Sequence, residues 1–225
     1  MQQAKAARFR DMTLDGFVEL LGSATPAPGG GSASAIAASL GASLVAMVGR
    51  LSEGREKYAA HAATHAWAIA AATELADRFL RLADEDAAAY DAFAAAMKLP
   101  RETDDERSAR TVALRRAAVV ASEVPLRTVE ACVELAVAAD ALAGRSNRNA
   151  SSDLGVASLL AEAAVHGAAE NVYVNLPSLG DEARAATLRE QAGRCVDDVV
   201  AIGARIRAAV ATGEERPPLP GGAPR

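Results

Sequence analysis

Two long stretches of the chain, residues 57–97 and 103–142, are rich in alanine and contain no glycine and a single proline, Pro125. Alanine is the strongest helix former and carries little side-chain volume. Aromatic residues make up only 4% of the 225 residues, and this composition favours closely packed helices over a sandwich of sheets. We therefore expect an all-α fold, a bundle of about five to seven mostly long antiparallel helices.

Helical periodicity and helix-breaking residues divide the chain into six expected helices. They span residues 13–22, 33–51, 57–97, 103–142, 151–174 and 181–211. A capping box at residues 103–106 begins the fourth helix, and Pro125 is expected to kink it or split it. Residues 1–213 are predicted to form a single domain, and the proline- and glycine-rich residues 214–225 a disordered tail.

Charge, hydropathy and cysteine usage limit the class of protein. The formal net charge of −5 argues against nucleic acid or an anionic membrane as the main partner. Residues 33–49 are uncharged and apolar but shorter than the ~20 residues that span a bilayer, so we expect a buried helix. The N-terminus lacks the apolar run of a secretory signal, and Cys132 and Cys195 fit two buried, reduced thiols of a cytoplasmic protein. The three histidines are scattered without zinc-like spacing, so we expect no metal site.

An aspartate interrupts the apolar face of the 57–97 helix. At about 100° per residue, one narrow stripe of this helix contains Asp86 together with Leu75, Phe79, Leu82, Tyr90, Phe93 and Met97. A carboxylate on an apolar seam is unfavourable unless it is paired or used, and burial would raise its pKa toward the range that a general acid or base needs. From the residues alone, a catalytic Asp86 and a structural Asp86 that caps a helix or pairs with an arginine are equally good interpretations.

Two polar residues mark the 151–174 helix. Its apolar stripe comprises Val156, Leu160, Ala163, Gly167 and Val174. Asn171 sits at the edge of this stripe, where a buried amide needs hydrogen-bond partners from the protein or from a ligand. Asp153 lies in the first turn, and its interaction with the helix dipole explains it without any function.

A glycine run, Gly29-Gly30-Gly31, stands between Pro28 and Ser32 at the start of the 33–51 helix. It fits neither a Walker loop nor the G-x-G-x-x-G spacing of a dinucleotide site. Its backbone amides could receive a planar or anionic ligand, and a plain flexible turn is the alternative. Lys57 and Lys98, each in a basic cluster at a helix end, could hold a ligand carboxylate or simply be solvated.

Four blocks, taken together and in this order, resemble the cyclodeaminase/cyclohydrolase family. The blocks read TPAPGGGSASAIAASLGASLVAMVGRL, DEDAAAYDAFAAAMKLPRET, ASEVPL and SSDLGVASLLAEAAVHGAAENVYVNLPSL. The family comprises the C-terminal domain of formiminotransferase-cyclodeaminase and stand-alone bacterial methenyltetrahydrofolate cyclohydrolases. The chain departs from its usual pattern at Arg148, where proline is frequent, and at Ser52, where threonine is common.

The resemblance implies an all-helical enzyme that works as a homodimer or higher assembly through its helices and acts on a tetrahydrofolate derivative without a cofactor. It makes Asp86 the catalytic residue and implies a folate pocket that includes the turn Gly29, Gly30, Gly31 and Ser32 together with Asp153 and Asn171. Lys57 and Lys98, from the basic clusters, are expected to bind the same substrate. Methenyltetrahydrofolate cyclohydrolase is the first expectation, because no formiminotransferase domain is present. Formimidoyltetrahydrofolate cyclodeaminase and a non-catalytic folate-binding or structural assembly are the alternatives.

Overall fold

The computed structural model of the chain describes residues 8–224, and this part contains six α-helices, five short 3-10 helices and no strand. The α-helices are α1 (Leu14–Leu21), α2 (Gly30–Arg50), α3 (Ala62–Met97), α4 (Asp104–Leu142), α5 (Ser151–Asn175) and α6 (Glu182–Thr212). The all-α prediction is therefore confirmed. The expected break near the start of the 57–97 segment is also present, as a 3-10 helix at Glu56–His61 that precedes α3.

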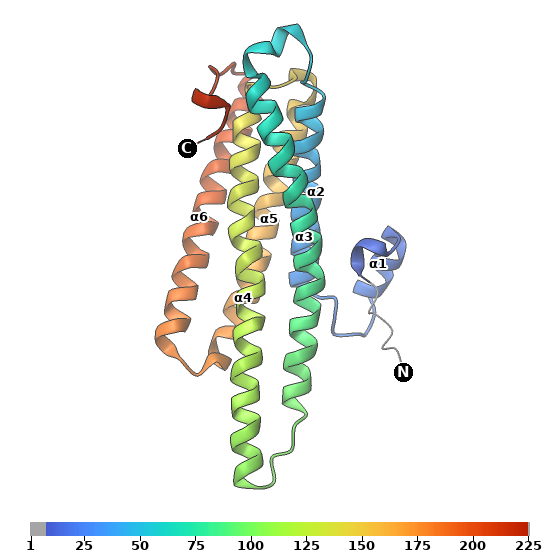
Figure 1. The fold of residues 1–225 in the computed structure, drawn as a ribbon, viewed down its shortest axis with the longest axis vertical. Helices are drawn as coiled ribbons and strands as arrows, with labels where there is room; N and C mark the ends of the chain where they lie inside the picture. Colours follow the sequence, from blue (N-terminus) through green and yellow to red (C-terminus); the bar gives the residue numbers. More distant parts are fainter. Residues whose placement is uncertain (1–7, 225) are drawn as a thin grey trace.

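Helices α2, α3, α4 and α5 pack in a ring, each against the next, and α6 lies against α4 and α5. The bundle is long and narrow, and the hairpin of α3 and α4 extends beyond the other helices at one end (Figure 1). Helix α1 lies to the side of the bundle (Figure 1). Helix α2 begins and helix α5 ends part-way along the α3–α4 hairpin. At this level the N-terminus of α2 and the C-terminus of α5 therefore lie against the sides of α3 and α4.

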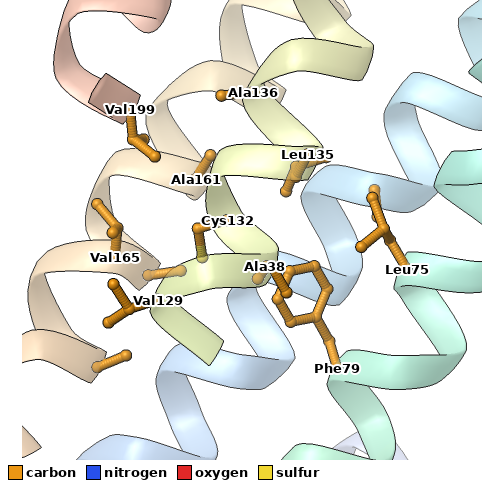
Figure 2. Close-up of a cluster of buried hydrophobic side chains, with 14 of the residues drawn as sticks. Ala38, Leu75, Phe79, Val129, Cys132, Leu135, Ala136, Ala161, Val165 and Val199 are labelled. Atoms are coloured by element: carbon orange, nitrogen blue, oxygen red, sulfur yellow. The ribbon is translucent and has the colours of Figure 1, made fainter. Parts of the chain in front are cut away.

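Small residues in the core let the helices approach closely. Phe79 of α3 is fully buried and points into the space between α2 and α4, where Ala38 and Leu135 lie (Figure 2). A Cβ atom on Gly41 of α2 would approach the Ala157 carbonyl of α5 to 3.3 Å. Alanine and glycine thus bring the backbones together, and a few larger side chains fill the gaps that remain.

Pro125, which was expected to kink or split this helix, lies inside a continuous α4, so the helix is not split. Proline lacks an N–H, and it therefore leaves the carbonyl of Ala121, four residues earlier, without its intrahelical partner. The side chain of Asn175 donates a hydrogen bond of 2.8 Å to that carbonyl from α5. The capping box is as predicted, with Thr103 and Glu106 bonded reciprocally.

In α1 only Phe17 is buried, and Leu14 is 80% exposed. The apolar stripe predicted for α5 faces outward, with Val156 47% and Val174 71% exposed. The side of α5 that enters the core carries alanines together with Leu154, Val165 and Val172, which are fully buried. The helix therefore has two apolar sides, and the side that periodicity singled out is the outer one. Leu40 of the adjoining α2 is 56% exposed as well.

Helix α2 is long and apolar enough to cross a membrane by length and hydropathy, and 56% of its most apolar window is buried inside the bundle. Both cysteines are free, with Cys132 buried and Cys195 only half-buried. For residues 214–224 the composition predicts disorder, and the structure instead lays them against the bundle. Arg216 pairs with Asp140 at 2.9 Å, and the Arg145 guanidinium donates to the Pro217 carbonyl at 2.6 Å.

Candidate functional site

Asp86 lies at the wall of a cavity of about 410 Å³, where the first turn of α2 meets the sides of α3 and α5. The glycines Gly29, Gly30 and Gly31 line one side of the cavity, and Asn171 and Asn175 of α5 line another. Asp86 is half-buried and has no cationic partner among the ion pairs of the described residues. A carboxylate in such a position is not serving as half of a salt bridge.

Gly31 makes room for the Asp86 carboxylate. A Cβ atom at this position would lie 2.3 Å from Asp86 Oδ1, closer than any van der Waals contact allows. At Gly30, one residue earlier, a Cβ atom would meet only Asn171 Nδ2, at an ordinary 3.5 Å. Two adjacent glycines therefore differ sharply in what they do, and only Gly31 is required for the position of the acid.

Ser32 contacts the same carboxylate from the buried side. Its side chain is fully buried and does not line the cavity, although the resemblance places Ser32 in the folate pocket. Ser32 Oγ lies 3.0 Å from Asp86 Oδ2 and 3.0 Å from the Ala83 carbonyl oxygen. A hydroxyl has one hydrogen, so Ser32 donates either to the ionised Asp86 or to Ala83. When it donates to Ala83, a protonated Asp86 can donate to Ser32 Oγ.

The environment shifts the pKa of Asp86 upward. Burial raises the pKa of this carboxyl above its ordinary value, and hydrogen bonds from the Ser32 hydroxyl and backbone N–H offset part of the rise. The N-terminus of α2 adds a positive partial charge beside the ionised form. The carboxyl is thus suited to give and to take a proton closer to neutrality than an exposed aspartate is.

Larger apolar side chains form the remainder of the wall. Tyr90, Phe93 and Met97 follow Asp86 along α3, on the stripe that the periodicity predicts. The stripe divides in two: Leu75, Phe79 and Leu82 are buried in the core, whereas the later residues line the cavity. The reason is that α3 and α4 extend past the end of the core here (Figure 1). Flat apolar walls and a few polar groups are typical of small-molecule sites.

Three other predicted residues lie elsewhere in the chain. Lys57 precedes α3, about 36 Å of helix from Asp86 at 1.5 Å per residue, and Asp153 lies about 27 Å from Asn171 along α5. Lys98 is exposed, directly after Met97 at the end of α3, and does not line the cavity. One chain therefore brings Asp86, the glycines and Asn171 together, and leaves Lys57 and Asp153 at the opposite end.

Lys57 lines a second, smaller cavity of about 130 Å³ at that opposite end, together with Tyr58, His61, Arg148 and Arg216. The Lys57 ammonium lies 5.5 Å from the centre of the Tyr58 ring. Glu214 and Glu215 also line this cavity, and within residues 8–224 neither Lys57 nor Arg148 is in an ion pair. Within residues 8–224, no group of three or more His, Cys, Asp or Glu side chains could hold a metal ion.

Asn175 is a cavity residue that was not among the predicted site residues. Its Nδ2 atom donates to the carbonyls of Ala121 and Asn171, both at 2.8 Å, and its side chain lines the cavity beside Asn171. Asn175 stands four residues after Asn171, so both occupy one face of α5. The four-residue spacing could have predicted that Asn175 lies beside Asn171. The hydrogen bond from Asn175 to α4 could not be predicted from the sequence, because it depends on which carbonyl of α4 faces α5.

Comparison with known proteins places the chain among folate enzymes. Residues 13–194 match the family described as formiminotransferase-cyclodeaminase. The chain is 38% identical over 171 residues to a methenyltetrahydrofolate cyclohydrolase from Methylorubrum extorquens, covering 76% of this chain and 82% of that protein. It is 37% identical to a formimidoyltransferase-cyclodeaminase from Gallus gallus, covering 75% of this chain but only 31% of that longer protein.

The fold is likewise shared with a solved structure. The crystal structure of a formiminotetrahydrofolate cyclodeaminase from Thermotoga maritima superposes with a TM-score of 0.80, covering 90% of this chain and 98% of that one. The two sequences are 22% identical. At that identity the likeness concerns the arrangement of helices, and the assignment of chemistry has to come from the cavity.

Proposed function

The chain belongs to the formiminotransferase-cyclodeaminase family, and from this premise we propose that it is a methenyltetrahydrofolate cyclohydrolase with Asp86 as general acid and base. One observation carries the assignment of Asp86. Its carboxylate is half-buried at the wall of a cavity and has no cationic partner among the described residues. Gly31 leaves room for this carboxylate, and Ser32 forms a hydrogen bond with it. Asp86 accepts hydrogen bonds from the first turn of α2, as a structural aspartate also would, but no lysine or arginine among the described residues pairs with it and its side chain lines the cavity.

The hydrolysis requires one proton acceptor that later becomes a donor. A water molecule attacks the cationic carbon of the methenyl bridge, and Asp86 takes a proton from that water as the C–O bond forms. The neutral adduct then loses its hydroxyl proton to solvent as its C=O bond forms and the bond from carbon to N5 breaks. Asp86 returns its proton to N5, which leaves 10-formyltetrahydrofolate and a net release of one proton.

The electrostatics of the cavity suit this sequence of steps. The ionised Asp86 favours the cationic substrate, because the low-dielectric wall strengthens the attraction between opposite charges. Ser32 supports the ionised form by donating to it, and it supports the protonated form by turning its hydrogen to Ala83. Neither state of Asp86 leaves a buried donor without an acceptor. Neither reaction step changes an oxidation state, so no redox cofactor is required.

The alternative is the cyclodeaminase reaction at the same site. There N10 of 5-formimidoyltetrahydrofolate attacks the formimidoyl carbon, and Asp86 protonates the amine that leaves as ammonia. Sequence identity supports the cyclohydrolase: the chain is 38% identical to the Methylorubrum cyclohydrolase and 22% identical to the cyclodeaminase from Thermotoga maritima, which it covers almost completely.

The proposal includes a homodimer formed through the outer side of α2 and α5. Larger apolar residues are exposed on these two adjoining helices, among them Leu40 and Leu159, which is 53% exposed. Residues 30–49 of α2 contain no charged side chain. An extended apolar surface of this kind is typical of a face that a second copy covers. In an antiparallel pair, the Lys57 end of one chain would approach the Asp86 cavity of its partner.

The test offers both substrates to the purified protein. Loss of the methenyl chromophore reports the hydrolase, and release of ammonia from 5-formimidoyltetrahydrofolate reports the deaminase. We expect fast loss of the chromophore and little ammonia. Ammonia release as the faster reaction would reverse the order of the two candidates. If neither substrate turns over in a folded protein, the enzymatic proposal is wrong.

A further inference from the structure

Pro125 and Asn175 form a link between α4 and α5 that the proposed reaction does not itself explain. Without an N–H at position 125, the Ala121 carbonyl has no intrahelical donor, and Asn175 supplies one at 2.8 Å. Ala121 and Asn175 both line the Asp86 cavity. The link therefore lies in the cavity wall, although Pro125 itself is buried behind it.

The bonds of the two asparagines fix which amide atom faces which way. Asn175 Nδ2 donates to the carbonyls of Ala121 and Asn171, and Asn171 Nδ2 donates to the carbonyl of Gly167 at 2.8 Å. All three acceptors are backbone carbonyl oxygens, so each amide must turn its N–H groups, and not its oxygen, toward them. Neither amide can therefore be flipped, and in both side chains the donor end is committed to the protein.

The acceptor ends are left for a ligand. Neither Asn171 Oδ1 nor Asn175 Oδ1 has a hydrogen-bond partner in the structure, and neither is a buried, unsatisfied atom. Both residues are half-buried, so the two oxygens must be reachable by solvent, and both side chains line the cavity. The site thus offers a pair of uncharged acceptors on one face of α5, four residues apart.

We propose that this pair selects the ligand by accepting hydrogen bonds from the N–H groups of a pterin ring, and that Pro125 is the positioning residue that holds Asn175 in place. The inference rests on the proposed function for its ligand. A pterin carries an amino group and ring N–H donors along its edge, and these can donate to the two amide oxygens. The side chain of Asn175 is oriented by its bonds to the carbonyls of Ala121 and Asn171, and the first of these is open because residue 125 is a proline.

The first test is Pro125→Ala, which restores an N–H to α4. That N–H will bond to the Ala121 carbonyl and compete with Asn175 for it, which weakens the Asn175 hydrogen bond. We expect KM for methenyltetrahydrofolate to rise about fivefold, as the loss of one neutral hydrogen bond would produce, with kcat within a factor of about two. The melting temperature should stay the same or rise, because alanine suits a helix interior better than proline. An unchanged KM would overturn the role of Pro125.

A double-mutant cycle separates this link from a general effect of proline on the helix. Asn175→Ala alone should raise KM by about fivefold to tenfold. Adding Pro125→Ala should then change KM no further, because the contact is already lost. Additive effects would mean that Pro125 acts through the shape of α4, and the proposal would be wrong. Asn149→Ala, an exposed asparagine at the other end of the bundle, is the matched control.

Two fragments of the substrate test which part the asparagines bind. A tetrahydropterin without the tail and p-aminobenzoylglutamate without the ring are each used as competitive inhibitors. In Asn175→Ala we expect the inhibition constant of the pterin to rise with KM and that of p-aminobenzoylglutamate to stay constant. The reverse pattern would place the amides at the tail and overturn the inference. Turnover by the wild-type protein tests the proposed function separately from these comparisons.

Discussion

The two ends of the bundle hold cavities of different character. Where α2 begins, the larger cavity contains one carboxylate, two amides and a wall of aromatic and apolar side chains. At the other end, where α5 begins, the smaller cavity is lined by Lys57, Arg148 and Arg216 together with Glu214 and Glu215 of the C-terminal tail. The larger cavity holds one acid without an ion-pair partner among the described residues, whereas the smaller cavity holds basic and acidic side chains together.

In the proposed function, the larger cavity would serve the reaction and the smaller one would hold a charged group of the substrate. Folate itself has the same division, with a reactive ring system at one end and carboxylates at the other. The sequence predicts Asp86 and Lys57 as residues of one substrate site, and about 36 Å of α3 separates them in a single chain. Both predictions can hold together only where the Lys57 end of one chain meets the Asp86 end of another. The substitutions that follow test these separate roles of the two ends.

The largest effect is expected for Asp86→Asn. Without a group that takes and returns a proton, turnover should fall by a factor of about 100 or more. The fold should stay intact, as circular dichroism and the melting temperature would report. Turnover near the wild-type rate would remove Asp86 from the mechanism.

The same variant has a predicted pH dependence of stability. Burial raises the pKa of Asp86 in the folded protein, so the proton binds more tightly there than in the unfolded chain. The resulting stability is present below the ordinary pKa of an aspartate and is lost as the pH rises through the raised value. At neutral pH, Asp86→Asn should therefore melt at the same or a higher temperature than wild type. A clear loss of stability at pH 7 would instead mark Asp86 as structural.

The adjacent glycines provide the next largest effect. In Gly31→Ala the new Cβ would collide with the Asp86 carboxylate and push it out of place, so we expect turnover to fall more than about tenfold. In Gly30→Ala the new methyl group makes only ordinary contacts, so turnover should stay within about threefold of wild type. Similar losses in the two variants would mean that the whole turn matters rather than the room for Asp86.

Ser32→Ala should change the pH profile more than the maximal rate. The serine lowers the pKa of Asp86, so its removal raises that pKa further. The acid limb of the pH–rate profile, which reports loss of the ionised Asp86, should move to higher pH. A shift to lower pH, or none, would contradict the assignment of that limb to Asp86. Thr128→Ala, at a buried hydroxyl outside the cavity, controls for the loss of a buried polar group.

The smallest effect is expected at the opposite end. If a partner chain brings its Lys57 to the cavity, Lys57→Ala should raise KM by about twofold to fivefold, the range for a solvent-exposed charge pair, and leave kcat unchanged. Inhibition by a tail-free pterin should not change. Arg116→Ala, exposed and outside both cavities, is the control. An unchanged KM would mean that the two ends work independently.

By itself, the sequence determined the helices and the family. Alanine content, capping residues and prolines act over a few neighbouring residues, so α1 to α6 could be located to within a few positions. The misplaced acid on the α3 stripe was also readable, because a helix face follows from spacing alone. The position of Asp86 in a cavity agrees with that signal, and its catalytic role stays a prediction.

Only the tertiary structure decided which polar residues meet. It separated Lys57 and Asp153 from Asp86, made Gly31 and Ser32 supports for the acid, and revealed Asn175. It also decided which of the two apolar sides of α5 enters the core, with Leu154, Val165 and Val172 buried and Val156 and Val174 exposed. These outcomes depend on the register between helices that are distant in sequence. That register is set by close packing over the whole bundle, which no local pattern encodes.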